Sequence, residues 1–377
     1  MASAKLHVGV VGLGFGAEFV PIYLHHPNVA SVAICDTNED RVRDVADKFG
    51  VTRCYTDFKK LLQSDDLDAV HLVTGIPAHA EQAQAVLQAG KHCACTVPMA
   101  TTLDDLHQIV AAQRQSGKQY MMMETSVYTR QFLYVRDMLA RGAFGQLQFL
   151  RGAHYQDMEH WPSYWMGLPP MHYATHAVAP LLAAANTRAT TVHCFGSGVM
   201  REELHQPYGN PYPFESAIFQ LAGMPVAIEV SRSLFHTARE YVESFTIYGE
   251  RLTFEWNIEQ DAPLLYAMEP IRPGRGRPIS MQRLDEIPDR QDILPASIAR
   301  FTKRGVYDET NLHRSFLQGG GHHGSHPHLV HEFISSIIEQ RAPYIDAVTA
   351  ANWTAAGICA HLSAMQGGEA VQIPSFD

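Results

Sequence analysis

The sequence predicts an α/β protein: an N-terminal, doubly wound parallel sheet of the Rossmann type, then an α/β domain with an open, mostly antiparallel sheet. Three observations predict this fold. A glycine-rich turn follows the first apolar run, and apolar runs then alternate strictly with helical patterns up to residue 125. From Gly145 onward, strand patterns dominate. We therefore expect a domain boundary near residue 125.

The first strand and turn have the order of a dinucleotide-binding unit. Residues 6–11 form a β-branched run followed by Gly12-Leu13-Gly14-Phe15-Gly16, and a second run, 29–35, ends at Asp36. Gly12 permits a tight turn and Gly14 lets the backbone approach a pyrophosphate, whose oxygens accept from the next helix. Asp36 would accept the ribose hydroxyls and repel a 2′-phosphate. An ordinary strand–helix turn also uses glycine, but the distal acid favours bound NAD.

The remaining elements of the first domain, residues 1–125, alternate along the chain. Three segments are expected to be helices: 38–49, which closes on Gly50, the short segment 57–62, and 102–116, which the Thr102 cap opens. A further helix follows Pro77-Ala78-His79 and ends near Gly90. Strands are expected at 69–73, 92–95 and 119–123. This alternation implies parallel strands with right-handed crossovers.

The second domain, residues 126–377, begins with a long helix at 128–141. Strands follow, several of them joined by short hairpin turns: 146–155, 190–196, 216–221, 226–232, 244–248 and 251–256. Residues 261–318 are rich in Pro, Arg and Gly and are expected to form a long, partly irregular insertion. Two helices, 327–340 and 348–365, close the chain.

Composition excludes several classes of partner. The net charge of −10 disfavours nucleic acid and anionic membrane surfaces. The sequence lacks an apolar run of about 18 residues that could span a bilayer. The first strand begins close to Met1, which leaves little room for a signal peptide, and six cysteines are scattered rather than spaced as a disulfide framework. We expect a reduced, cytoplasmic protein.

The segment from Met171 to His176 carries the candidate catalytic residues. At helical spacing His172 and His176 share one face, and Tyr173 lies beside His176. A tyrosine and a histidine near one carbon can act as a general acid and base on either side of neutral pH. The alternative is that all three are core residues of a helix packed under the sheet.

Other residues have weaker signals. Glu124 ends a strand where α/β sheets bind ligands, so it could orient a nicotinamide or simply lie at a helix start. Tyr155 and Trp165 could hold a sugar ring or belong to a packed loop. His322 and His323 could line the same pocket. Although these two begin a histidine-rich run to residue 331, we expect no metal site.

The residues together resemble the Gfo/Idh/MocA family of glucose–fructose oxidoreductases and inositol dehydrogenases. The matching motifs are GLGFGA, the Thr74 to His79 turn, residues 89–105 (AGKHCACTVPMATTLDD), Phe144-Gly145 and the helix bearing His176. The resemblance implies that NAD contacts the glycine turn, Thr74, His79, Thr96 and Pro98. It also implies a sugar or cyclitol substrate at the open sheet, and a homodimer or homotetramer.

Two departures from this family matter. Its dehydrogenases usually carry Glu-Lys-Pro where this chain has Thr96-Val97-Pro98, and valine cannot exchange a proton. They also place an Asp four residues before a His, where this chain has His172 and His176. The NAD-dependent, redox-neutral glycosidases of the α-N-acetylgalactosaminidase type also lack the lysine. They have elements resembling residues 122–124, 128–130, 173–176 and 321–324.

Three hypotheses follow. The first is redox-neutral cleavage of a glycoside through a 3-keto intermediate, with Tyr173 and His176 exchanging the protons. The second is net NAD-dependent oxidation of a sugar or cyclitol hydroxyl, with one of these residues replacing the lysine. The third is a non-catalytic NAD-binding sensor, in which both residues would be dispensable.

Overall fold

The computed structural model describes residues 5–377, and the chain folds into two units. Unit 1 comprises the chain up to Arg130 with Asp289–Ala351 and Phe376–Asp377, and unit 2 comprises Gln131–Pro288 and Asn352–Ser375. The first boundary lies close to the expected position. The return of the chain to unit 1 after Pro288 differs from the expected second domain of residues 126–377, because it depends on long-range packing.

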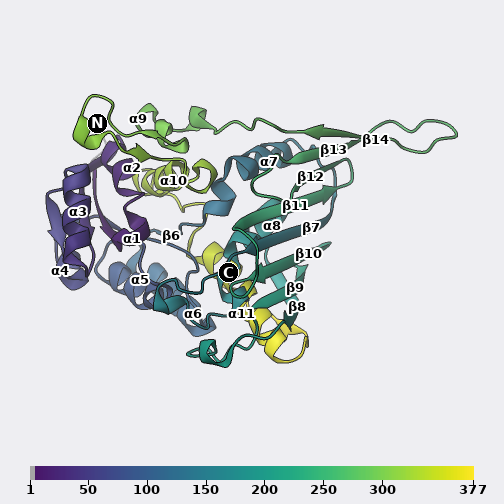
Figure 1. Ribbon diagram of the computed structural model, residues 1–377, viewed down its shortest axis with the longest axis horizontal. Coiled ribbons are helices and arrows are strands. Elements are labelled where there is room, and N and C mark those ends of the chain that lie inside the picture. Colours follow the sequence, from purple (N-terminus) through teal and green to yellow (C-terminus); the bar gives the residue numbers. More distant parts are fainter. Residues whose placement is uncertain (1–4) are drawn as a thin grey trace. The chain divides into compact units, whose positions relative to one another are not determined.

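Unit 1 contains a six-stranded parallel sheet in the order β3-β2-β1-β4-β5-β6, the doubly wound arrangement that the sequence predicts (Figure 1). The strands are β1 (Leu6–Val11), β2 (Val29–Cys35), β3 (Arg53–Tyr55), β4 (Ala69–Leu72), β5 (His92–Cys95) and β6 (Tyr120–Met122). β3 was not predicted, because its three residues are too short to show a period. The order places the topological switch point between β1 and β4, beside the glycine turn.

Helices connect these strands: α1 (Leu13–Gly16), α2 (Val20–His25), α3 (Glu39–Phe49), α4 (Phe58–Leu62), α5 (His79–Gln88) and α6 (Leu103–Ser116). Their caps agree with the sequence. The side chains of Asn38, Asp57 and Thr102 accept backbone N–H groups at the starts of α3, α4 and α6. Local sequence therefore fixes where these helices begin.

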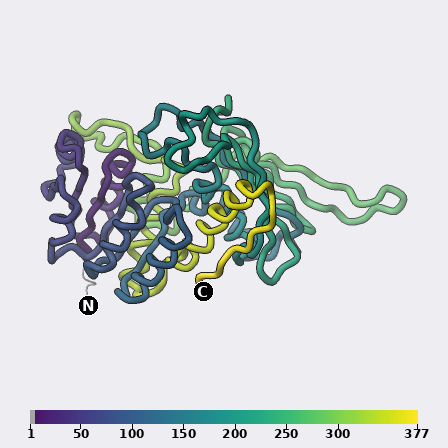
Figure 2. Tube along the Cα trace, turned by 90° about the horizontal axis from the view of Figure 1, so that it is seen from below, coloured from purple at the N-terminus to yellow at the C-terminus, as the bar shows by residue number. Residues whose placement is uncertain are grey.

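The returning part of unit 1 is more regular than expected. Residues 289–318 form short helical turns around α9 (Ala296–Ala299) and a small hairpin, β15 (Gly305–Val306) with β16 (Leu317–Gln318). α10 (His326–Ile338) and the start of α11 (Ala347–Met365) follow, within two residues of the predicted helices. In Figure 2 this green segment runs along the purple N-terminal helices of the same unit.

Unit 2 is built on a nine-stranded sheet in the order β14-β13-β12-β11-β7-β10-β9-β8-β17. Only the β7–β10 pair is parallel among these described strands, which confirms a mostly antiparallel sheet. The strands are β7 (Leu147–Tyr155), β8 (Ala189–Ser197), β9 (Phe214–Leu221), β10 (Met224–Ser233), β11 (Val242–Gly249), β12 (Leu252–Trp256), β13 (Leu264–Met268), β14 (Ile279–Arg283) and β17 (Val371–Gln372).

The expectation of an irregular insertion at 261–318 is corrected here too. Its first part forms β13 and β14, a long hairpin that widens the sheet and projects beyond it in Figure 1. The Pro, Arg and Gly residues that masked the strand pattern lie mainly in the hairpin's loop, between Met268 and Ile279.

Helix α8 (Thr175–Ala185) packs on one face of this sheet, and α7 (Arg130–Ala140) leads into the unit. The packing of α8 on the sheet depends on Gly152 of β7, because a Cβ there would lie 2.3 Å from the carbonyl oxygen of Ala177. The opposite face carries exposed side chains such as Phe195 and Ile218, as expected of an open sheet. None of the described helices has the length and apolarity needed to cross a membrane.

Candidate active site and cofactor site

The glycine turn of unit 1 has the geometry of a pyrophosphate cradle. Gly12 adopts φ 86°, and a Cβ there would lie 2.4 Å from the carbonyl oxygen of Val73, so only glycine fits. Beside Gly14 there is open space within 4 Å of where a Cβ would be, so a ligand can approach the backbone. Gly16 packs closely on β1, since its Cβ would lie 3.2 Å from Cγ1 of Val10. The residues present therefore fit a dinucleotide.

Asp36 lies at the end of β2, as predicted, and its buried carboxylate is held in place. It accepts hydrogen bonds from the backbone N–H groups of Leu13 at 2.8 Å and Asn38 at 2.9 Å. The half-exposed Arg41 pairs with it at 3.1 Å. The Asp36 carboxylate thus links the glycine turn to the end of β2, the strand that would present this carboxylate to a ribose.

Thr74, His79, Thr96 and Pro98 come together at the carboxyl edge of the same sheet. His79 is buried, with Nδ1 2.8 Å from the carbonyl oxygen of Pro98 and Nε2 3.1 Å from that of Thr74. Burial lowers its pKa, while these two backbone carbonyls act in the opposite direction. A neutral imidazole can donate to one carbonyl at a time. His79 thus connects the two loops that would border the nucleotide.

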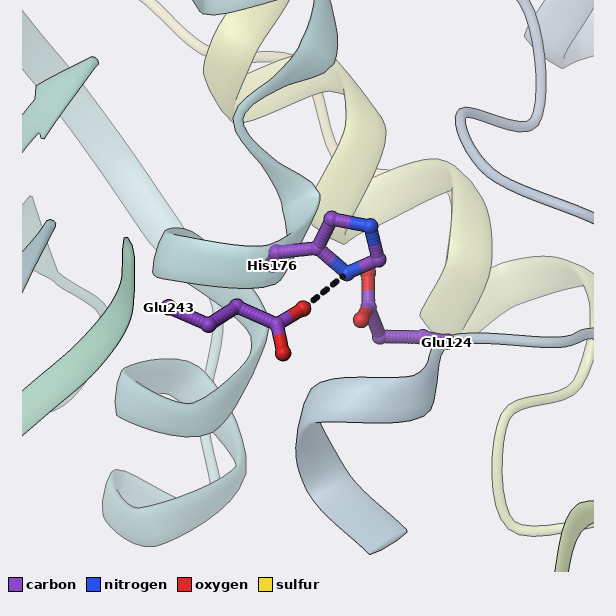
Figure 3. A group of neighbouring side chains, drawn as sticks. All are labelled: Glu124, His176 and Glu243. Atoms are coloured by element: carbon purple, nitrogen blue, oxygen red, sulfur yellow. Dashed lines mark ion pairs between the residues drawn. The ribbon is translucent and has the colours of Figure 1, made fainter. Parts of the chain in front are cut away.

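Glu124, labelled in Figure 3, is fully buried. It follows β6 and begins the helical turn η2 (Thr125–Tyr128). Its carboxylate accepts the backbone N–H of Ser126 at 2.9 Å. The structure thus confirms the helix-start interpretation. It does not test a contact with the nicotinamide, which stays a prediction.

His322 and His323 occupy a strained turn of unit 1, with φ of 41° and 51°. The ring of His322 contacts that of Phe15 in the glycine turn, with centroids 5.8 Å apart, and its Nδ1 lies 3.4 Å from the hydroxyl of Thr125. The carbonyl oxygen of His323 accepts from Arg130 at 3.2 Å. His322 therefore lies beside the expected nucleotide.

In unit 2, Tyr173 and His176 are brought together as predicted. The phenolic oxygen of Tyr173 lies 3.3 Å from Nε2 of His176, and Nδ1 of His176 lies 3.1 Å from a carboxylate oxygen of Glu243 on β11 (Figure 3). His176 and Glu243 are both buried. The three groups form a continuous chain in which a base is oriented by a carboxylate, an arrangement suited to moving protons.

The prediction that His172 shares a helix face with His176 is wrong. His172 lies in the turn η4 (Pro170–Tyr173), and Ala174 separates this turn from α8 with non-helical ψ of 4°. The His172 ring instead lies 5.1 Å from that of His361, whose Nδ1 pairs with Glu215 at 2.7 Å. Burial and the neighbouring His361 lower the pKa of His172 to about 3, so it stays neutral.

Of the two aromatic residues expected to hold a sugar ring, Trp165 lies beside Tyr173 and Tyr155 does not. The ring of Trp165 lies 4.7 Å from that of Tyr173 and can line a ligand there. Tyr155 does not join this group, because strand alternation points it to the face opposite that of His154, where its ring packs against Phe214. Trp165 therefore remains a candidate, whereas Tyr155 is not part of this cluster.

Sequence reasoning missed four residues around Tyr173: His154, Arg232, Tyr241 and Glu243. The ring of His154 lies 5.0 Å from that of His176 and 5.1 Å from that of Tyr241. Arg232 is fully buried and donates from Nε to the carbonyl oxygen of Tyr173 at 2.8 Å. Burial raises the pKa of Tyr241 well above its usual value. These groups make the surroundings of Tyr173 strongly polar.

Comparison with known proteins identifies the N-terminal unit. Residues 6–124 match the model of the Gfo/Idh/MocA family, described as an oxidoreductase family with an NAD-binding Rossmann fold. A glycosyl hydrolase family 109 protein of Bacteroides thetaiotaomicron is 24% identical over 98% of this chain and 84% of its own length. Another, from Shewanella pealeana, is 32% identical over 47% of this chain and 43% of its own.

Solved structures agree on the fold. An oxidoreductase domain protein from Kribbella flavida superposes with a TM-score of 0.79 at 20% identity, covering 99% of this chain and all of its own. A levoglucosan dehydrogenase with NADH and levoglucosan gives 0.79 at 18% identity, covering 98% of this chain and 100% of its own. The match confirms the resemblance drawn from the motifs for residues 6–124, which have the NAD-binding Rossmann fold of the Gfo/Idh/MocA oxidoreductases, and NAD is the cofactor of that fold.

Proposed function

We propose that this protein cleaves a glycoside by a redox-neutral cycle in which a sugar hydroxyl is oxidised, the aglycone is eliminated, water adds and the ketone is reduced. The observation that carries this proposal is the chain of contacts from Tyr173 through His176 to Glu243. The absence of the dehydrogenase lysine, replaced by the buried Val97, supports it. So do the full-length relatives named glycosyl hydrolase family 109 proteins.

The cycle needs hydride transfer and several proton movements. NAD⁺, when bound, takes a hydride from C3 of the sugar and later returns it. Loss of the hydroxyl proton gives a 3-ketone, which acidifies the hydrogen on C2. Removal of that proton expels the aglycone from C1, and the aglycone leaves with a proton from a general acid. Water then adds at C1 with return of a proton to C2, and in the final reduction C3 regains its hydride and the C3 oxygen regains its proton. Hydrolysis is therefore the net reaction, with no net oxidation.

In this proposal Tyr173 and His176 exchange these protons. The phenolic oxygen of Tyr173 is the outer group of the chain and would contact the sugar. His176 can take the tyrosine proton at Nε2, because Glu243 stabilises the resulting imidazolium through Nδ1. Trp165 stands beside Tyr173 and can pack against an apolar sugar face.

A panel of aryl glycosides with NAD⁺ in trace amount tests this function. We expect aglycone release over many turnovers per NAD⁺ while absorbance at the NADH band stays flat. Tyr173→Phe and His176→Ala should each abolish the release. Release that is unchanged in both variants would instead support an NAD-binding sensor whose apparent hydrolysis comes from a contaminant.

Net oxidation of a sugar or cyclitol hydroxyl is the second candidate function. The pair of His176 and Glu243 favours it, because this pair can accept a hydroxyl proton without a lysine. It predicts NADH formation in proportion to substrate consumed, with any glycosidic bond intact.

We also propose a homo-oligomer, supported by the apolar Phe195 and Ile218 on the open sheet face. A reducing, cytoplasmic location is supported by six unbridged cysteines.

A further inference from the structure

Four neighbouring strands of unit 2 each place one ionisable side chain in a single row across the sheet. In the strand register Glu215 pairs with Arg232, Arg232 with His154, and His154 with Glu243. Residues paired in register point to the same face, here the face covered by α8. All four are buried. A transverse row of ionisable groups inside a sheet is costly to bury unless each group has a compensating contact.

This row holds the candidate catalytic segment at three points. Glu215 accepts the backbone N–H of Met171 at 2.8 Å, Arg232 donates to the carbonyl oxygen of Tyr173 at 2.8 Å, and Glu243 pairs with His176. The contacts follow chain order along the segment and strand order across the sheet. The row therefore fixes the position of the turn that carries Tyr173 relative to α8.

Arg232 contributes more than hydrogen bonds. Its Nη1 donates to the carbonyl oxygen of His154 at 3.0 Å and contacts that of Ser233, so these acceptors are uncharged. Its guanidinium carbon lies 5.4 Å from the centre of the Tyr173 ring. Burial lowers the pKa of Arg232 to about 9, and Tyr173, Tyr241 and Glu243 oppose that shift. The side chain is still a cation at neutral pH.

We propose that Arg232 is a positioning residue, an inference that rests on the proposed function. Arg232 fixes the Tyr173 backbone, and its charge stabilises the phenolate left when Tyr173 gives up its proton. A neutral donor could make the same bonds to carbonyl oxygens. A buried cation beside a phenol ring, by contrast, favours the ionised form of that phenol.

Other ionisable groups also face Tyr173 within unit 2, and their effects differ in sign. His176 approaches from α8 and His154 from β7, and either would favour the phenolate only when protonated. Glu243 approaches from β11, and Tyr241 from the residue just before that strand. The negative forms of both oppose ionisation of Tyr173. Among these groups and Arg232, the guanidinium is the permanent cation near neutral pH.

The experiment measures the titration of Tyr173 itself. Tyrosines labelled with ¹³C at Cζ are followed by NMR against pH in the full-length protein, with the Tyr173 signal assigned from Tyr173→Phe. Arg232→Met removes the charge and Arg232→Lys keeps it. We expect the methionine variant to raise the titration midpoint of Tyr173 by about one pH unit or more, and the lysine variant to restore most of the difference. Arg151→Met, an arginine on the opposite face of β7, is the matched control and should change nothing.

The pH profile of kcat/KM for aglycone release should move with the NMR midpoint. An unchanged Tyr173 midpoint in a folded Arg232→Met protein would overturn the inference. If that variant does not fold, the unaltered protein decides: a Tyr173 signal that titrates above about pH 10, the value for free tyrosine, would also overturn it. Because NMR needs no turnover, an inactive protein with a shifted Tyr173 would refute the proposed function alone.

Discussion

Nδ1 of His176 lies 3.1 Å from a carboxylate oxygen of Glu243, and both side chains are buried in unit 2. Since the other imidazole nitrogen faces the phenol of Tyr173, the carboxylate fixes the orientation of the ring and stabilises its protonated form. A helix residue and a strand residue far apart in sequence thus meet, and under the proposed function Glu243 is a third residue on which activity should depend.

Glu243→Gln should therefore lower kcat by about 10²-fold or more, because the amide cannot stabilise an imidazolium. Steady-state kinetics of aglycone release measure this effect. Glu229→Gln, which alters an ion pair with Arg151 on the opposite face of the sheet, is the control and should keep full activity. A Glu243→Gln enzyme with normal kcat would exclude a role for this carboxylate in catalysis.

Val97 stands where the Gfo/Idh/MocA dehydrogenases that the sequence resembles carry lysine, so Val97→Lys should introduce a group that moves the hydroxyl proton. We expect NADH to accumulate with the glycosidic bond intact, measured by absorbance and by product analysis. Val97→Met, of similar length without charge, separates the ammonium group from a packing effect at this buried position. Equal NADH yields from the two variants would show that lysine loss does not limit net oxidation.

Asp36 should determine the choice of cofactor. Asp36→Ala removes the carboxylate that we expect to face the ribose and frees Arg41, its partner at 3.1 Å, to bind a 2′-phosphate. The ratio of the Kd values for NADPH and NADH should fall about tenfold or more, the scale of a lost charge-assisted hydrogen bond. Fluorescence titration measures both constants, with the exposed Asp40→Ala as control. An unchanged ratio would contradict the assignment of Asp36 to the ribose.

Buried histidines should make the protein less stable in acid. Burial lowers the pKa of His71 in β4 to about 3 from 6.5, so the folded chain keeps it neutral while the unfolded chain protonates it. Between these values the unfolded state binds the extra proton, and the free energy of unfolding falls as pH decreases, by about 1.4 kcal/mol per pH unit for this group.

Urea unfolding at pH 7, 6 and 5 checks this dependence. His71→Phe, whose ring suits the neighbouring Phe19 and Tyr23, should have a shallower slope than the unaltered protein. His160→Asn, at an exposed position, should leave the slope unchanged. Equal slopes for His71→Phe and the unaltered protein would contradict the effect of burial.

Local sequence predicted most of the fold because strand and helix signals are local. The predicted run at 92–95 is β5, and Thr102 caps α6 through the N–H of Asp105. By contrast, the prediction that His172 shares a helix face with His176 was wrong because it assumed helical spacing across Ala174. At that residue the chain changes from a 3₁₀ turn to an α-helix. Periodicity alone does not reveal such a break.

The row of Glu215, Arg232, His154 and Glu243 across the sheet could have been predicted in part from strand alternation. Arg232 continues the inward alternation of Ile228 and Val230, and Glu243 precedes that of Phe245 and Ile247. A charged residue in the buried register of a strand needs a partner, and this indicates a functional or structural role. Which partner it finds depends on strand order, which a single sequence does not specify.

The central claim is tested most directly by deuterium at C2 of the sugar product. The enzyme would be incubated with an aryl glycoside and catalytic NAD⁺ in D₂O, and the released sugar examined by NMR and mass spectrometry. Our account predicts one solvent deuterium at C2 and none at C3, because the C2 proton exchanges with solvent while the hydride returns to C3. Aglycone release with hydrogen retained at C2 would contradict it, since the removed C2 proton passes to the phenol and imidazole of Tyr173 and His176, which exchange their protons with D₂O.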